Sequence, residues 1–539
     1  MPIKQIVIIL HTLFLGYAKV FLTMFIKKIH NRSGSVSVIV AEKNKGKYTK
    51  LATMGIARDE SEVDELMDRG RRWIAERQER LHPTLDFDGR AEAAKELERQ
   101  EVERVVSSIE NVLLNGCERI LDRVFDLVGF NAIDDKVFRQ LVHSRLSYRK
   151  AATVEYLKNY FDEDVDLSKI YRYLDKLNGR YKDMVQEISV RHTMEMLGGH
   201  IGVVFYDVTT LYFETDREDD LRRTGFSKEG RHSNPQIILG LLVSLGGYPL
   251  AYCIHEGNKY EGHTMLPVIE EFVRKYDLED FIVVADSGLM TAANIAELEQ
   301  LGYKYIIGAR IKGESDSVKK LILSMPKING QMHEIDKGGG RRLLVGYTDD
   351  RARKDSYNRN KGVRRLERLY KRGRLTKESI NKRGYNKFLD MSGDTTVVIN
   401  RERISQDSAW DGLKGYLTNT DIPTGDVFTA YHNLWNVERA FRIAKSKIEI
   451  RPMFHFTRKR IEAHVCICFV ALKCYKELER RLKAANIGMS VDKVLNMAKT
   501  VTTIVFRLPE SGKTVTKTMP MKRHQRIAKL FTDEFWGMR

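Results

Sequence analysis

The chain has 539 residues, 42% of them hydrophobic and only 10 of them proline, so it can bury several cores and should form about three or four domains. It carries 91 Lys and Arg against 73 Asp and Glu, and the net charge of +18 favours a polyanionic partner. Its five cysteines, an odd number without a paired framework, argue against a disulfide-built secreted domain and indicate a reducing interior.

An apolar run from Ile6 to Ala18 lies near the start of the chain. Lys19 interrupts it before the roughly 18 apolar residues of a membrane span accumulate, and no signal-peptide cleavage site is evident. We expect residues 1–23 to be an upstream-start extension and Met24 to be the natural initiation site. A membrane-tethered protein is the alternative, and it rests on this segment alone.

The next part of the chain combines a β-hairpin with helices. Strand-like runs from Val36 to Ala41 and from Tyr48 to Met54 flank a Lys/Asn/Gly turn, which predicts the hairpin. Helical patterns follow from Glu60 to Arg80 and from Arg90 to Leu121, and the stretch from Asp134 to Leu197 is mainly helical.

Two apolar strand patterns carry an aspartate each. Asp207 lies inside the run Val203–Phe213, and Asp286 ends the run that begins at Phe281. A helix from Thr291 to Leu301 and a strand from Tyr303 to Ala309 complete a βαβ unit, with Asp286 at the carboxyl end of its first strand, where α/β sheets keep their ligands. The alternative for Asp286 is a helix N-cap or loop anchor, a common role for a lone strand-end aspartate.

Tyr431, Glu438 and Lys445 are seven residues apart, about two turns of an α-helix, and Arg442 lies beside them. One helical stripe therefore should carry a carboxylate, a phenol and two cations, a set that suits metal and phosphate binding better than a core. The alternative is that Glu438 forms an ordinary surface pair with Arg442.

Taken together, the three carboxylates predict phosphodiester chemistry. Two aspartates and a glutamate can hold two divalent ions about 3.5–4 Å apart, where the ions stabilise the attacking and leaving oxygens of a displacement at phosphorus. Oxygen ligands favour Mg²⁺, with Mn²⁺ as a chemically similar substitute.

The order and spacing of these motifs resemble those of DDE transposases of bacterial and archaeal insertion sequences, in the insertion-sequence-four group. The signature of that group is tyrosine, two residues, arginine, three residues, glutamate, six residues and lysine. Tyr431, Glu438 and Lys445 match it in register, but Leu434 occupies the arginine position. This departure removes one expected phosphate or metal-site contact, which Arg439 or Arg442 would have to replace.

Further segments support the resemblance, which covers residues 195–475. They are Gly225-Phe-Ser-Lys228-Glu-Gly-Arg231 followed by Gln236, and His255-Glu-Gly-Asn258. The resemblance implies an α/β, ribonuclease-H-like core in which Asp207, Asp286 and Glu438 are catalytic and hold two Mg²⁺ ions. The residues expected to contact DNA are Tyr431, Arg442, Lys445, Lys228, Arg231, Arg364 and Arg365.

A basic block lies between Asp286 and Glu438. Residues 351–387 hold 15 Lys or Arg and 3 Asp or Glu, and we expect them to contact DNA. The alternative is a solvated helical face or a flexible basic loop. We interpret residues 312–425 as an inserted β-rich subdomain. Trp410 and Trp435 are candidates for stacking on a displaced base or for core packing.

Further along the chain, His464, Cys466 and Cys468 allow a zinc interpretation. They lie, however, in an apolar helical run, which favours core packing because tetrahedral zinc needs ligands that converge from separated pairs.

The predicted organisation follows the chain order. It comprises the extension (1–23), a mixed β-hairpin and helical DNA-end-binding region (24–195), the first part of the catalytic core (196–311), the insertion (312–425), the second part of the core (426–480) and a C-terminal segment (481–539).

The resemblance implies metal-dependent cleavage at insertion-sequence ends followed by strand transfer into target DNA. The expected partner is double-stranded DNA, both as terminal inverted repeats and as target, and at least a dimer should bind it. We expect a cytoplasmic, nucleoid-associated protein that makes no membrane contact. Because of Leu434, the alternative is a catalytically inactive regulator that binds DNA ends. A purely hydrolytic endonuclease would share the same metal site.

Overall fold

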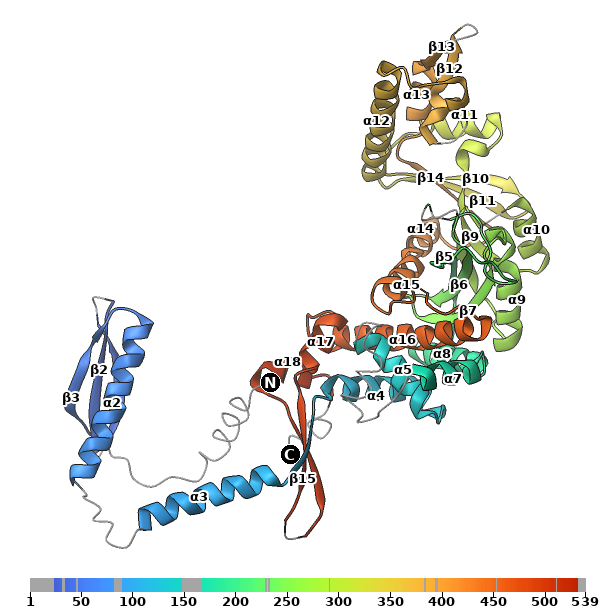
Figure 1. Cartoon of the computed structure of the whole chain (residues 1–539). Coiled ribbons are helices and arrows are strands. Elements are labelled where there is room, and N and C mark those ends of the chain that lie inside the picture. Colours follow the sequence, from blue (N-terminus) through green and yellow to red (C-terminus); the bar gives the residue numbers. More distant parts are fainter. Residues whose placement is uncertain are drawn as a thin grey trace. The chain divides into compact units, whose positions relative to one another are not determined.

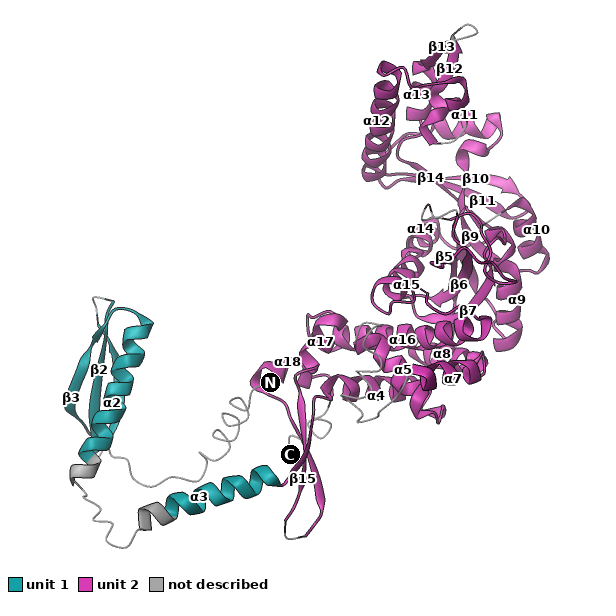
Figure 2. Ribbon diagram, viewed as in Figure 1, with its two compact units in different colours: residues 1–107 teal, residues 108–539 magenta. Residues whose placement is uncertain are grey.

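The computed structural model forms two compact units, Met1–Ser107 and Ser108–Arg539 (Figures 1 and 2). It describes residues 24–31, 34–44, 47–81, 90–147, 167–227, 230, 233–289, 291–381, 384–392, 396–451, 453–509 and 511–531. Within these ranges no helix is long and apolar enough to cross a membrane. The predicted extension at residues 1–23 lies outside them.

The first unit is a three-stranded antiparallel sheet with a helix on one face. Its elements are β1 (Met24–His30), β2 (Val36–Asn44), β3 (Lys47–Ala57), α2 (Glu60–Leu81) and α3 (Arg90–Ser107). The predicted hairpin is confirmed as β2 and β3, and β1 adds a third strand beside β2. Val63 and Leu66 of α2 pack on Val38 and Val40, and Gly55 permits this approach because a Cβ there would lie 2.8 Å from Leu66 Cδ2.

The second unit is built on an eight-stranded sheet in the order β10-β11-β14-β9-β8-β5-β6-β7. Five of its strands are β5 (Val203–Tyr212), β6 (Gln236–Ser244), β7 (Pro249–Glu256), β8 (Ile282–Ala285) and β9 (Lys304–Ala309). β5, β6 and β7 pair antiparallel, whereas β8 and β9 continue parallel to β5. This order and these directions are those of a ribonuclease-H-like sheet, so the predicted core is confirmed.

The insertion is more helical than the predicted β-rich subdomain. Three of its strands, β10 (Met332–Gly338), β11 (Arg341–Tyr347) and β14 (Leu413–Thr418), extend the core sheet next to β9. The rest comprises α11 (Asp316–Ser324), α12 (Asp349–Lys371), α13 (Arg401–Ser408) and the hairpin β12 (Leu389–Ser392) and β13 (Thr396–Ile399). Most of the basic block is therefore the helix α12.

Helices cover both faces of the core sheet (Figure 1). α9 (Met265–Tyr276) and α10 (Ala292–Gln300) lie on one face, and α14 (Thr424–His432), α15 (Trp435–Ser446) and α16 (Arg458–Ala484) lie on the other. Alternate residues of β5 reach opposite cores, since Phe205 packs on the side of α15 and α16 while Tyr206 packs on the side of α9. Thr291 caps α10 by accepting a hydrogen bond from Asn294 N.

α16 is buried along most of its length among α4 (Gly116–Val128), α5 (Lys136–Ser147), α7 (Leu167–Leu177), α8 (Lys182–Met196) and α17 (Val491–Ala498). A helix that is apolar around most of its circumference belongs inside a core. Cys466 and Cys468 lie on it with 0% and 1% exposure, and His464 Nε2 is 3.2 Å from Ile450 O. Core packing, rather than zinc binding, is therefore the role of these residues.

The predicted helical stretch from Arg90 to Leu121 is wrong in its middle. A strand, β4 (Ile109–Leu113), separates α3 from α4 and pairs with β15 (Thr502–Arg507). β15 also pairs with β16 (Thr514–Met519), ahead of the short α18 (Gln525–Ala528). The partner of β4 is thus almost four hundred residues away, and this tertiary pairing overrides the local helical pattern.

A buried lysine predicts a pH-dependent stability. Lys473 Nζ on α16 donates to Ser189 O at 2.9 Å and Thr193 Oγ1 at 2.5 Å, and burial lowers its pKa to about 7. Between about pH 7 and pH 10 the unfolded chain holds a proton there that the folded chain has lost, so the free energy of unfolding rises with pH. Lys473→Met should flatten this rise in thermal unfolding, whereas Lys483→Met, on an exposed position of the same helix, should not. If the unfolding temperatures of the wild type and of Lys473→Met changed with pH in the same way, the lowered pKa of Lys473 would be contradicted.

Candidate active site

Asp207 and Asp286 lie at the same level on neighbouring parallel strands. β5 and β8 pair in a register that ends at Tyr206 opposite Ala285, so Asp207 and Asp286 are the next residues in line. By strand alternation both belong to the sheet face that packs against α15, the face of Phe205 and Val284. Asp207 is half-buried and accepts a hydrogen bond from Val208 N at 2.8 Å, while Asp286 is exposed.

Tyr431 of α14 reaches across β9 to Asp286. Its hydroxyl donates to Asp286 Oδ1 at 3.0 Å, and its ring packs edge-on against Tyr416 at 4.8 Å between centroids. Burial, followed by the charge of Asp286, raises the pKa of Tyr431, so the phenol stays protonated and can donate. Gly308 leaves room for this arrangement, because a Cβ there would lie 2.6 Å from the Tyr431 hydroxyl oxygen.

The signature residues lie on two helices rather than on the one continuous stripe that was predicted. α14 ends at His432 and α15 begins at Trp435. At the junction, Leu434 N bonds to Tyr431 O and Val437 N bonds to Leu434 O, so the chain tightens from i→i−4 to i→i−3 hydrogen bonds. Tyr431 therefore belongs to α14, whereas Glu438, Arg442 and Lys445 follow on α15.

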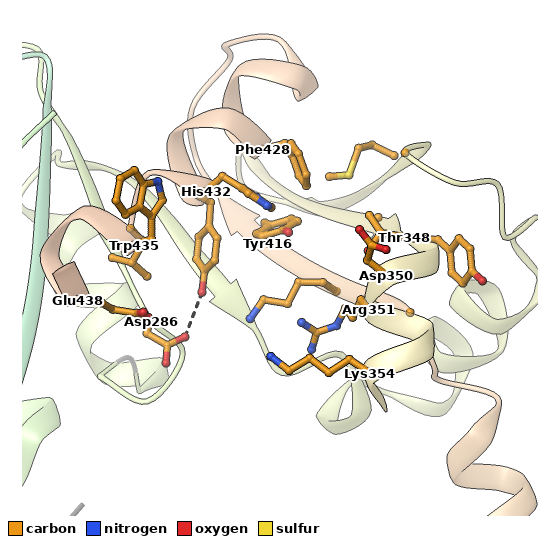
Figure 3. A pocket seen from close by; sticks show the side chains of 18 residues that line it. Asp286, Thr348, Asp350, Arg351, Lys354, Tyr416, Phe428, His432, Trp435 and Glu438 are labelled. Atoms are coloured by element: carbon orange, nitrogen blue, oxygen red, sulfur yellow. Dashed lines mark hydrogen bonds between the residues drawn. The ribbon is translucent and has the colours of Figure 1, made fainter. Parts of the chain in front are cut away.

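A cavity of ≈ 620 Å³ lies between Tyr431 and Glu438 on one side and residues of the insertion on the other (Figure 3). Asp286, Glu438 and Tyr431 line it from the core, and Arg351, Lys354 and Lys414 line it from the insertion. Figure 3 shows Glu438 beside Asp286, with Arg351 and Lys354 of α12 projecting from the opposite wall. The cavity thus combines anionic and cationic groups in one space.

The donor set fits a divalent metal ion of the hard type. Asp207, Asp286 and Glu438 offer only carboxylate oxygens, which Mg²⁺ and Mn²⁺ prefer. In the described part of the chain, however, no group of three or more His, Cys, Asp or Glu side chains is close enough together to hold a metal. The residue types and the shared sheet face fit the ion, and the coordination itself stays a prediction.

Three cations of the site were missed as site residues by the sequence analysis. Lys414 lies on β14, and Arg351 and Lys354 lie in the first turns of α12. Arg351 and Lys354 fall within the basic block, but no local pattern separates them from the other cations there. Lys414 has no local signal at all, because only the pairing of β14 with β9 brings it to the site.

The other predicted site residues differ in their positions. Arg439 of α15 pairs with Glu479 and lies over the Trp435 ring, 5.7 Å from its centroid, so its guanidinium already has two protein partners. Arg364 and Arg365 are exposed on α12, while Lys228 and Arg231 lie outside the described residues. Trp410 packs against the insertion core, whereas Trp435 is 47% exposed and lines the cavity.

The family model for the transposase DDE domain matches residues 198–473, which is just over half of the chain. The chain belongs to this family. The match contains both aspartates, the insertion and the signature helices, and a transposase function follows from it.

Two solved structures are similar to this chain. One is the cryo-EM structure of a piggyBac transposase synaptic complex with hairpin DNA, with 10% identity and a TM-score of 0.35 over 71% of this chain and 70% of that chain. The other is a Mos1 transposase paired-end complex with left transposon end, with 11% identity and a TM-score of 0.15 over 34% of this chain and 57% of that chain. No curated protein matches the chain.

The supporting segments of the DDE domain pack against one another beside β6. Gln236 Nε2 donates to Phe226 O at 3.0 Å and Gly257 O at 2.9 Å, which ties the two glycine-containing segments together. A Cβ on Gly225 would lie 2.3 Å from Gly257 O, so a side chain there is excluded. These residues shape the loops that follow β5 and β7.

The close approach at Gly308 yields a stability prediction. Gly308→Ala should overpack the Tyr431 hydroxyl and lower the free energy of unfolding by about 1–3 kcal/mol. The same substitution in a Tyr431→Phe background should cost less, since the clashing oxygen is absent. Gly425→Ala is the matched control, because nothing lies within 4 Å of its Cβ position. Equal losses with and without the Tyr431 hydroxyl in chemical denaturation would contradict this packing.

Proposed function

We propose that this transposase belongs to the insertion-sequence-four group of bacteria and archaea and is catalytically active. It cleaves DNA at insertion-sequence ends in a metal-dependent reaction and transfers the cut strand into target DNA. The observation that carries the proposal is the placement of Asp207 and Asp286 in register on adjacent strands, with Glu438 lining the same cavity as Asp286. A regulator that only bound DNA would have no need of this arrangement.

Asp207, Asp286 and Glu438 would hold the metal ions. Two Mg²⁺ ions bound there, or Mn²⁺ in their place, would stabilise both the attacking and the leaving oxygens of an in-line displacement at phosphorus. Tyr431 orients the Asp286 carboxylate through its 3.0 Å hydrogen bond and keeps its proton, because its pKa is raised. Arg442 and Lys445, further along α15, position the phosphates of the bound DNA.

The proposed partner is double-stranded DNA, both as terminal inverted repeats and as target. The net charge of +18 and the exposed Arg364 and Arg365 on α12 support this, because phosphate neutralisation dominates non-specific affinity. Holding two DNA ends together would need at least a dimer, and we place the protein in the cytoplasm on the nucleoid.

The first unit offers a surface suited to the DNA-end-binding role that was predicted for residues 24–195. On the sheet face opposite α2, alternate positions of the three strands carry Lys27, Lys43 and Lys50. Among the described residues of that face there is no Asp or Glu. Lys27 and Lys43 Nζ lie 5.2 and 5.6 Å from the ring centroid of Tyr48, which is 57% exposed. A basic sheet face with an exposed aromatic side chain suits the DNA backbone and grooves.

A catalytically inactive regulator of DNA ends is the second candidate, and one observation favours it. Leu434 stands at the arginine position of the signature and is 7% exposed, within the apolar core. An apolar side chain there cannot contact a phosphate.

The decisive experiment uses DNA ends flanking the element, a supercoiled target and Mg²⁺. The wild type should cleave and join, and Asp286→Asn should lower both by at least about 10³-fold, because it removes a negative metal ligand. Asp280→Asn, at an exposed loop position before β8, is the control and should retain activity. End binding by the wild type without any metal-dependent product would support the inactive regulator instead.

The sheet face of the first unit predicts a salt effect. Replacing Lys27, Lys43 and Lys50 with Gln should weaken binding to DNA ends and reduce the slope of log affinity against log salt by about 2–3. Replacing Arg71, Arg72 and Arg77 on α2 with Gln removes the same charge from the same unit and should change the slope less. Titrations by fluorescence anisotropy between about 50 and 200 mM salt measure both. Equal salt slopes for the two triple variants would exclude this sheet face as the DNA-binding surface of the first unit.

A further inference from the structure

Lys414 is the cation of the site that no motif accounts for. It lies on β14, where Leu413 packs into the insertion core and Tyr416 packs into the main core beside α14. Lys414 alternates in phase with Tyr416, so it belongs to the sheet face of Tyr431 and the carboxylates. Its Nζ lies 5.2 Å from the centroid of the Tyr431 ring, and its side chain lines the same cavity as Asp286 and Glu438.

The ammonium of Lys414 has no hydrogen-bond partner among the described residues. In the part of the chain that the structure describes, Nζ makes no hydrogen bond and no ion pair, although the side chain is half-buried. The pKa of Lys414 is lowered from its usual value by burial, and the charge of Asp286 opposes this effect only in part. A partly buried cation without a hydrogen-bonded partner carries a desolvation cost, which an anion entering the cavity would offset.

Two other cations near the signature have protein partners. Arg439 pairs with Glu479. Arg351 donates through Nε to Leu413 O at 3.2 Å and lies 3.6 Å from Asp355 Oδ2. Lys354 and Arg442 are exposed, whereas Lys414 is half-buried with its Nζ 5.2 Å from the centroid of the Tyr431 ring. Lys414 is therefore the cation best placed to receive a phosphate beside Tyr431.

We propose that Lys414 is the cation that positions the scissile DNA phosphate, in place of the arginine that Leu434 displaces from the signature. The inserted segment thereby contributes a residue to the active site through β14. A lysine presents a compact charge with rotatable donors, so it can contact a phosphate oxygen from a neighbouring strand. This inference rests on the proposed function.

The test uses the full chain and measures single-turnover cleavage of end DNA in Mg²⁺. Lys414→Met keeps most of the aliphatic stem beside Tyr431 and should lower the cleavage rate about 10²-fold, as the loss of one positioned donor does. Affinity for the ends should change less than threefold, because many phosphates contribute to it. Lys414→Arg should retain more activity than Lys414→Met. The control Lys312→Met removes a cation that pairs with Asp407 outside the cavity of the carboxylates and should cleave normally.

Rescue separates a positioning role from a structural one. Adding Leu434→Arg to Lys414→Met returns a cation to the arginine position of the signature. The double variant should cleave at least tenfold faster than Lys414→Met alone. Wild-type cleavage by Lys414→Met would overturn this inference alone. So would a parallel loss of folding, DNA affinity and cleavage that neither Lys414→Arg nor Leu434→Arg relieves. A wild-type chain whose products match those of Asp286→Asn would instead overturn the proposed function, and this inference with it.

Discussion

The parallel pairing of β5 with β8 is the constraint on which the site depends. It sets Asp207 level with Asp286 and directs both toward the face that α15 covers. A shift of one residue in either strand would turn its aspartate to the opposite core, where Tyr206 and Val283 pack. The apolar residues on both faces therefore fix the register of the two strands. This register also sets how close the like-charged carboxylates of Asp207 and Asp286 lie, a repulsion that a metal ion could offset.

Tyr431 connects this sheet to the second part of the core. Its hydroxyl holds Asp286, its ring packs on Tyr416, and the missing side chain of Gly308 makes both contacts possible. A phenol buried beside a carboxylate resists ionisation, so the hydrogen bond persists across the physiological pH range. Asp286 is exposed, and this hydrogen bond restricts the orientation of its carboxylate.

The sequence predicted those features of the fold and site that local patterns determine. The apolar strands around Asp207 and Asp286 and the helix after Asp286 follow from periodicity. The seven-residue spacing of Tyr431, Glu438 and Lys445 drew attention to their segment. β4 was missed because its partner is distant in sequence, and the break between α14 and α15 was missed because all of its residues are compatible with a helix. The roles of the triad and the DNA contacts remain predictions, since no metal or DNA partner defines them.

An inserted segment could form a separate domain attached to the core, but the strands of this insertion are part of the core sheet. β14 and β11 continue the core sheet from β9, and Tyr416 of β14 packs directly on Tyr431. The edge of β9 would be unpaired without them, and an unpaired edge beside an active site invites aggregation. The inserted residues therefore complete the core sheet. This makes the cations on β14 and α12 part of the same folded body as the carboxylates they face.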